Sequence, residues 1–163
     1  MTEHESRLNQ ELLDILQTQT LAALGTLDAD GSPSVSMVPF AIEPESGCVV
    51  LHVSGVAPHT AHMRADSRVS MLVIAPGEAG HGNSAAPRVT LSAMARFIEV
   101  GSALAERCRQ AYFHRFPQHH ELDAMLEYSF VSLSLRQARQ VSGYGAMRSM
   151  SESNLMPLLA AAA

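Results

Sequence analysis

The chain has 163 residues, of which 47% are hydrophobic and 17% charged, and its formal net charge is −5. This length fits one domain with a substantial core, and the negative charge argues against a general affinity for nucleic acid or anionic membranes. Cys48 and Cys108 are too few and too isolated for a disulfide framework or a thiolate metal site. The polar N-terminus and the lack of a membrane-length apolar run predict a soluble, cytoplasmic protein.

The first half of the chain predicts one helix followed by three strands. Residues 6–17 carry apolar side chains at helical spacing, with Glu11 and Asp14 on the opposite side. Three apolar segments follow, joined by short turns that contain glycine: residues 21–27, 34–42 and 48–53. Such connections predict an antiparallel meander and leave no room for the helical crossovers of a Rossmann fold.

Residues 51–73 predict a strand, a tight loop, a short helix and a second strand. Gly55 ends the first strand, and Pro58 is typical of a first helical position, which needs no N–H. A helix start directs several unpaired N–H groups at one point, and this arrangement favours a phosphate. Three polar side chains lie close to that point in sequence: Ser54, His59 and Thr60. The alternative is a helix that only connects two strands.

The second half predicts a loop, a strand, helices and a closing strand. Residues 76–87 are rich in glycine, which predicts a mobile loop. Residues 88–100 alternate as a strand, and Ser102 suits the N-cap of a helix ending near Arg115. The last segments are a short helix, an alternating strand, a closing segment and a tail without a packing pattern: residues 119–127, 130–135, 141–146 and 151–163.

The predicted fold class is mainly β with inserted helices (α+β), as a single domain over residues 1–163. Six or so antiparallel strands with late helices are typical of a small closed or split β-barrel.

The histidines do not predict a metal site. His59 and His62 stand three residues apart, as metal ligands on one helix face can, but no cysteine or carboxylate joins them at ligand spacing. His52 lies inside an apolar strand and is interpreted as a core or interface residue. The others, His114, His119 and His120, cluster around Pro117, which indicates a solvated corner. No residue pattern identifies a catalytic group.

Several short motifs follow one another along the chain: Leu24-Gly25-Thr26, residues 33–40, Leu51-His52-Val53-Ser54, Ala57-Pro58-His59-Thr60, Asp66-Ser67-Arg68-Val69-Ser70, Pro87-Arg88-Val89-Thr90-Leu91 and Val141-Ser142-Gly143-Tyr144-Gly145. Their order and spacing resemble the FMN-binding split barrel of the pyridoxamine 5'-phosphate oxidase-like proteins, and within it the heme-utilization (HugZ-type) branch. The resemblance covers about residues 8–146.

This resemblance implies a homodimer with two FMN sites at the subunit interface. The cofactor residues it implies are Ser36, Met37 and Val38 against the flavin ring, Ser54, His59 and Thr60 at the phosphate, and Arg64 or Arg88 as a positive charge. The vitamin B6 oxidase itself carries a basic pair where this chain has His59 and Thr60, so its specific activity is not implied here.

Three functions remain open from the sequence. The first is an FMN-dependent oxidoreductase that acts on an unknown small molecule with an unknown electron donor. The second is a heme-binding or heme-utilization protein. The resembled proteins take a late histidine as iron ligand, and here His120 or His119 would have to serve. The third is a non-enzymatic dimeric ligand-binding protein. The low charged fraction also predicts the homodimer, with an interface of about 2,000 Å² or more.

Overall fold

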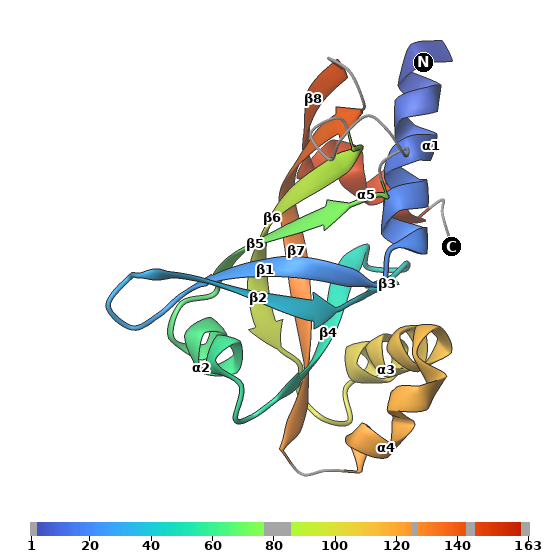
Figure 1. Cartoon of the computed structure of the whole chain (residues 1–163). Helices are drawn as coiled ribbons and strands as arrows, with labels where there is room; N and C mark the ends of the chain where they lie inside the picture. The colour runs from blue at the N-terminus through green and yellow to red at the C-terminus, as the bar shows by residue number, and fades with distance from the viewer. Residues whose placement is uncertain (1–2, 77–85, 125–126, 143–145, 161–163) are drawn as a thin grey trace.

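The computed structural model describes residues 3–76, 86–124, 127–142 and 146–160, and in these ranges the strands form one antiparallel sheet (Figure 1). The strands are β1 (Leu21–Leu27), β2 (Pro33–Pro39), β3 (Ala41–Glu43), β4 (Cys48–Ser54), β5 (Arg68–Ile74), β6 (Arg88–Phe97), β7 (Tyr128–Ser142) and β8 (Ala146–Ser151). The helices are α1 (Glu3–Thr18), α2 (Pro58–Ala65), α3 (Ala103–Arg115), the 3-10 helix η2 (Pro117–His119), α4 (His120–Asp123) and α5 (Glu152–Ala160).

The sheet curls so that its two edges approach each other at Phe40. The strand order is β2-β1-β5-β6-β7-β4-β3, which puts β2 and β3 at opposite ends of the sheet. Only Phe40 separates Pro39, where β2 ends, from Ala41, where β3 begins. One residue spans about 3.5 Å, so the two edges must be neighbours. The predicted split β-barrel is therefore confirmed.

The predicted meander is wrong in its second step. β1 and β2 form the expected hairpin, but the predicted strand over residues 34–42 breaks at Phe40, and β3 rather than β2 pairs with β4. The Phe40 side chain is fully buried, and its backbone N–H bonds to the carbonyl of Thr20. This break, together with β8, brings the described strands to eight instead of six.

β7 joins the two halves of the barrel. One edge of β7 pairs with β6, and the other pairs with β4 near its start and with β8 near its end. The sequence predicts this strand only over residues 130–135. The register with β6 shifts between Ser92 and Ala93, so Arg136 opposes no residue of β6, as at a β-bulge. The bulge interrupts the alternation of apolar residues, which is why the prediction ended too early.

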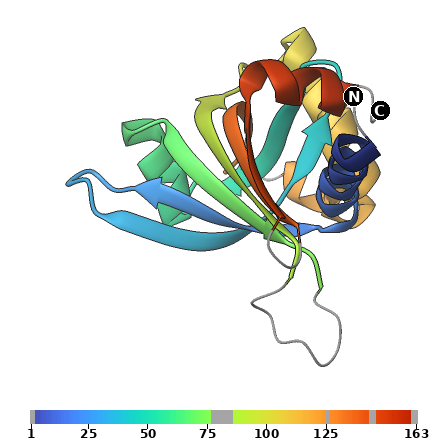
Figure 2. The same cartoon turned by 90° about the horizontal axis from the view of Figure 1, so that it is seen from above.

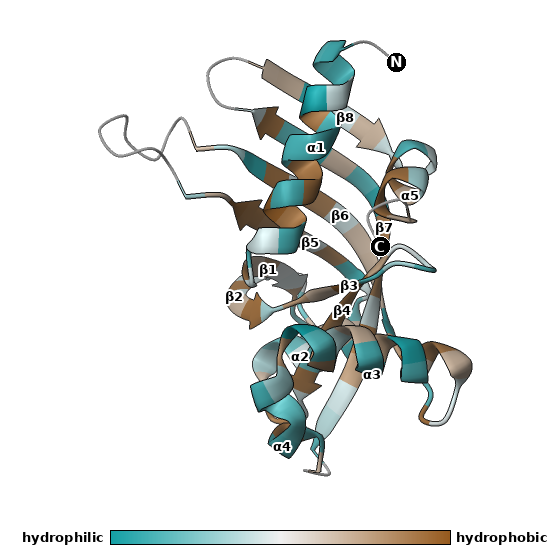
Figure 3. Ribbon diagram, turned by 90° about the vertical axis from the view of Figure 1, so that its right-hand side faces the viewer, coloured by the Kyte–Doolittle hydropathy of each residue, from teal (hydrophilic) through white to brown (hydrophobic). Residues whose placement is uncertain are grey.

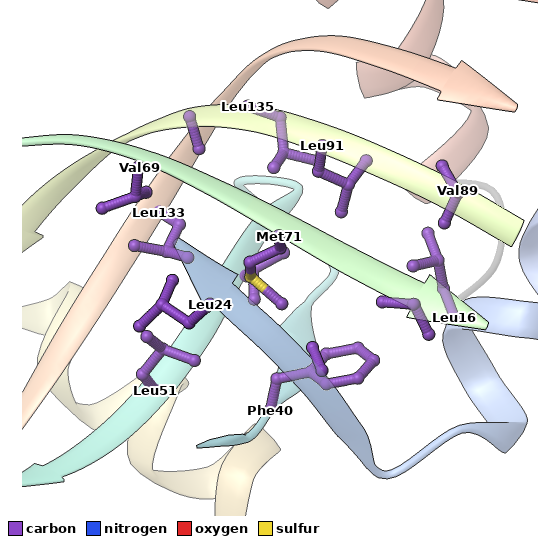
Figure 4. Close-up of a cluster of buried hydrophobic side chains, with 14 of the residues drawn as sticks. Leu16, Leu24, Phe40, Leu51, Val69, Met71, Val89, Leu91, Leu133 and Leu135 are labelled. Atoms are coloured by element: carbon purple, nitrogen blue, oxygen red, sulfur yellow. The ribbon is translucent and has the colours of Figure 1, made fainter. Parts of the chain in front are cut away.

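The core lies inside the curled sheet, with α1 and α5 against it. Apolar side chains from β1, β4, β5, β6 and β7 meet there with those of α1, as Figure 4 shows. α1 buries the four residues predicted from its spacing, and Figure 3 shows it crossing in front of the strands from β5 to β8. None of the helices in the described ranges is long and apolar enough to cross a membrane.

The C-terminal tail packs, contrary to the sequence interpretation. Residues 152–160 form α5, whose Leu155 and Leu159 are buried in the core. Pro157 stands inside this short helix, and Glu152 is its only charged residue, so the segment shows no clear amphipathic pattern. It packs against β7, against the preceding strand β8 and against α1 at the other end of the chain. Residues 77–85, most of the predicted mobile loop, lie outside the described residues.

The turn between β3 and β4 is built around the buried carboxylate of Glu43. Its Oε1 accepts a hydrogen bond from the Glu45 N–H (2.9 Å), and its Oε2 accepts one from the Ser46 N–H (3.0 Å) and one from the Ser46 hydroxyl. Arg107 of α3 places its Nε 3.6 Å from Oε1. Gly47 completes the turn with φ +62°, a conformation that favours glycine.

Candidate functional site

The loop between β4 and α2 ends in an open helix start. Gly55 donates its N–H to the carbonyl of Glu127, which anchors the loop to the residue before β7. Pro58 is the first residue of α2, as its sequence position predicts. The preceding Ala57 is extended (φ −73°, ψ 136°) and supplies no side-chain cap. The first turn of α2 therefore has the character of an anion-accepting helix start.

Two histidines of α2 are held by hydroxyl groups of the β1–β2 hairpin. His59 Nδ1 lies 3.2 Å from Ser36 Oγ, and His62 Nδ1 lies 3.0 Å from Thr26 Oγ1. Figures 1 and 2 show α2 beside this hairpin, which extends beyond the rest of the sheet. With Nδ1 engaged, Nε2 is the ring nitrogen that remains for a ligand.

The surroundings of His59 favour the neutral form of its imidazole ring. Burial lowers its pKa below the ordinary 6.5, and the nearby His62 lowers it further. A neutral imidazole with a fixed Nδ1 is the form in which histidine binds a metal ion. It adds no positive charge for a phosphate.

The polar groups predicted at a phosphate are partly engaged within the loop. The Thr60 hydroxyl donates to the carbonyl of Ser54 at 2.6 Å, and Thr60 is only 1% exposed. Its single proton is thus committed to the backbone. Ser54 Oγ accepts a long hydrogen bond (3.4 Å) from the Val56 N–H.

Thr60→Ala is expected to lower the free energy of unfolding by about 1–2 kcal/mol, because a buried hydrogen bond to Ser54 is lost. FMN and riboflavin affinities should then change in parallel, since the hydroxyl serves the loop and not a phosphate. Urea unfolding and fluorescence titration would measure both, with Thr60→Ser as the control that keeps the hydroxyl. A loss confined to FMN would contradict this role.

The two candidate arginines lie apart. The guanidinium carbon of Arg64 is 3.8 Å from the centre of the Phe97 ring, at the end of β6 nearer α2. Arg88 begins β6, nine residues before Phe97, which at about 3.3 Å per residue is about 30 Å away. Arg88 Nη1 donates to the carbonyl of Ala86. Within one chain, Arg88 is therefore too far from the start of α2 to contact a phosphate there.

The outer face of the sheet, opposite the core, exposes apolar side chains. Strand register places Met37 beside Ala23, then Leu72 and Thr90 on the neighbouring strands. Val38 points the other way and belongs to the core, so its side chain is not available to a ligand. The large exposed residues on this outer face are Leu21 (51%), Val35 (73%), Met37 (61%), Ile74 (47%) and Met147 (65%).

His52 is a core residue, as the sequence predicts. Its ring stacks on Phe130 with centroids 4.4 Å apart, and the rings of Tyr112 and Phe113 approach it edge-on. Burial lowers its pKa to about 4, against the opposing effect of Asp123. In the part of the chain that the structure describes, no three metal-binding side chains group together.

The predicted histidine corner is partly ordered by aromatic contacts. His119 Nδ1 lies 3.1 Å from the Tyr112 hydroxyl, and the ring stacks on Phe116. His120 is exposed and stacks on Phe113 with centroids 4.1 Å apart. Only His119 of these two has its Nδ1 fixed by a hydroxyl.

Residues 8–142 match the family model described as pyridoxamine 5'-phosphate oxidase. The chain belongs to this family. The match spans most of the chain and includes the β1–β2 hairpin, α2 and nearly all of the sheet.

The proteins that are similar to this chain include two that are described as heme proteins. The chain is 27% identical over 153 residues to the heme oxygenase HutZ of Vibrio cholerae, covering 93% of this chain and 86% of HutZ. A heme-binding protein of Mycobacterium smegmatis superposes with a TM-score of 0.83 at 26% identity, covering 92% of this chain. The chain spans only 60% of that protein. The crystal structure of HutZ, described as a heme storage protein, has a TM-score of 0.70 at 22% identity, covering 86% of this chain and 93% of HutZ.

Proposed function

We propose that this protein binds heme and takes part in heme utilization. HutZ is described both as an oxygenase and as a storage protein, and the two descriptions share heme binding. The M. smegmatis protein is also described as heme-binding. Heme binding is therefore the function that these relatives support in common.

The observation that carries the proposal is the state of His59. Its Nδ1 contacts Ser36 Oγ, burial favours the neutral ring, and its Nε2 has no partner among the described residues. A heme iron takes such an imidazole nitrogen as axial ligand. His119 is the second candidate ligand, because its Nδ1 contacts the Tyr112 hydroxyl.

Flavin-dependent oxidoreduction is the second candidate function. The uncapped start of α2 at Ala57 favours an FMN phosphate. Three observations argue against FMN. The Thr60 hydroxyl is already bonded to the Ser54 carbonyl, and the surroundings of His59 favour its neutral form. Arg88 of the same chain lies far from the start of α2. FMN would supply hydride or electron transfer when bound, and the chain would hold its phosphate at the start of α2.

A ligand titration of the purified wild-type protein separates the two functions. Hemin is expected to bind tightly with one site per chain and a shifted Soret band, while FMN and riboflavin bind weakly and about equally. Tight FMN binding, at least about tenfold stronger than riboflavin and with no hemin shift, would reverse the assignment to the flavin.

We also propose that the apolar outer face pairs two copies of the chain. Light scattering at micromolar concentration is expected to report twice the chain mass. Met37→Glu places a charge in this face on both copies and should raise the dimer dissociation constant about tenfold or more. The control is Val100→Glu, at a residue 96% exposed and outside the strands. A wild-type monomer, or equal effects of both variants, would contradict this pairing.

A further inference from the structure

Two cysteine thiols meet where α3 packs on the sheet. Cys48 begins β4 and Cys108 lies in the middle of α3, yet both belong to one buried cluster with Tyr112 and Phe116. They lie close enough for each thiol to shift the pKa of the other. Sixty residues of chain separate them, so folding alone brings them together.

A small cavity adjoins one residue of the pair. It has a volume of about 140 Å³ and is lined by Cys48 together with Gly47, Leu104 and Met156. Cys108 is not among its lining residues and is fully buried. A molecule the size of hydrogen peroxide fits this volume, since one water takes up about 30 Å³. We therefore expect hydrogen peroxide to react first with Cys48.

The two thiols also differ in acidity. The contact with Cys108 lowers the pKa of Cys48, and so does the Ser46 hydroxyl, which lies 3.2 Å from Cys48 Sγ. Burial and the Glu43 carboxylate oppose this effect. The same contact and burial raise the pKa of Cys108. Of the pair, Cys48 is the thiol that ionises, and the thiolate is the nucleophilic form.

We propose that Cys48 and Cys108 are a peroxide-reactive pair that forms a reversible disulfide between β4 and α3. The Cys48 thiolate attacks one oxygen of hydrogen peroxide, the O–O bond breaks, and the departing hydroxide takes a proton to become water. Cys48 is then a sulfenic acid. The Cys108 sulfur attacks the Cys48 sulfur, and the hydroxyl group leaves as a second water with the Cys108 proton. Two thiols lose two electrons, and one peroxide gains them.

Treatment of the full-length protein with one equivalent of hydrogen peroxide tests this proposal. Free thiols, counted after unfolding, are expected to fall from two per chain to none. The tryptic map should contain a Cys48–Cys108 linked peptide, and dithiothreitol should restore both thiols. Free N-acetylmethionine added to the sample is the reference, because its sulfoxide reports ordinary peroxide exposure. The thiols should be lost well before this reference is oxidised.

Two variants separate the roles of the thiols. Cys108→Ser is expected to stop at the Cys48 sulfenic acid, which dimedone traps, and Cys48→Ser should leave Cys108 unmodified under the same treatment. Circular dichroism checks that each variant folds. If a variant does not fold, the peptide map of the wild type still tests the proposal. Intact thiols in the wild type after the free N-acetylmethionine is oxidised, disulfides between chains, or equal trapping at both cysteines would overturn the proposal.

Discussion

Phe40→Ala is expected to lower the free energy of unfolding by about 3–5 kcal/mol, the cost of removing a fully buried phenyl ring. Phe40 is the single residue between β2 and β3, so the cavity would open where the two edges of the barrel approach. The Arg115 guanidinium, 4.9 Å from the centre of the Phe40 ring, would also lose the nearer of its two aromatic partners and keep Phe116. Whole domains are stable by about 5–15 kcal/mol, so this change consumes a large share.

Urea unfolding of three variants would measure the Phe40 effect. Phe40→Leu keeps most of the apolar volume and should cost less than Phe40→Ala. Val100→Ala, at a residue 96% exposed, should stay within about 0.5 kcal/mol of the wild type. A Phe40→Ala loss no larger than that of Val100→Ala would mean that the barrel does not depend on this corner.

Glu43→Gln has the second largest expected effect, about 1.5–3 kcal/mol. The Glu43 carboxylate is 2% exposed and accepts hydrogen bonds from Glu45 and Ser46, with Arg107 nearby. In the Gln variant an NH₂ group, with two N–H donors, replaces one carboxylate oxygen. It would face the N–H and O–H groups of Glu45 and Ser46 or the Arg107 guanidinium, which also donate, so hydrogen bonds are lost. The control is Glu45→Gln, because that carboxylate is 71% exposed and contacts only Arg107 among the described residues.

Glu43 also predicts how stability depends on pH. Burial acts to raise its pKa, but the hydrogen bonds of Ser46 and Glu45 and the charge of Arg107 outweigh it, and the pKa lies below the ordinary 4.5. Its contribution is therefore fully present above pH 4.5 and lost as the pH falls through the lower folded value. Glu43→Gln should flatten this part of the stability curve. Equal slopes for Glu43→Gln and wild type between pH 5 and 3 would contradict the assignment.

Much of the fold could be predicted because local pattern and burial agree. The spacing of Leu8, Leu12, Ile15 and Leu16 identified the buried face of α1. The apolar run of residues 48–53, in which His52 is the only polar side chain, identified β4. The break at Phe40 could not be predicted, because Phe40 is apolar and the sequence on both sides of it therefore has the pattern of one continuous strand. The order of strands that follows from it depends on contacts distant in sequence.

The sequence predicted the local structure around the candidate site, but not the contacts of its side chains. The start of α2 and residues Ser54, His59 and Thr60 lie where the sequence places them. The pairing of Ser36 with His59 and of Thr26 with His62 was missed, because it depends on how the hairpin lies against α2. One signal was present: Thr26 interrupts the apolar inward face of β1, where a polar residue needs a partner.

The most direct test of heme binding through His59 is the absorption spectrum of the hemin-reconstituted protein. The wild type should show the Soret band of an imidazole-ligated heme, and His59→Ala should weaken hemin binding at least about tenfold, with recovery on adding free imidazole. Ligation needs the neutral ring, so the wild-type band should persist as the pH falls to 6.5 and fade only below it. An unchanged spectrum and affinity in His59→Ala, with the loss appearing in His119→Ala instead, would contradict the account.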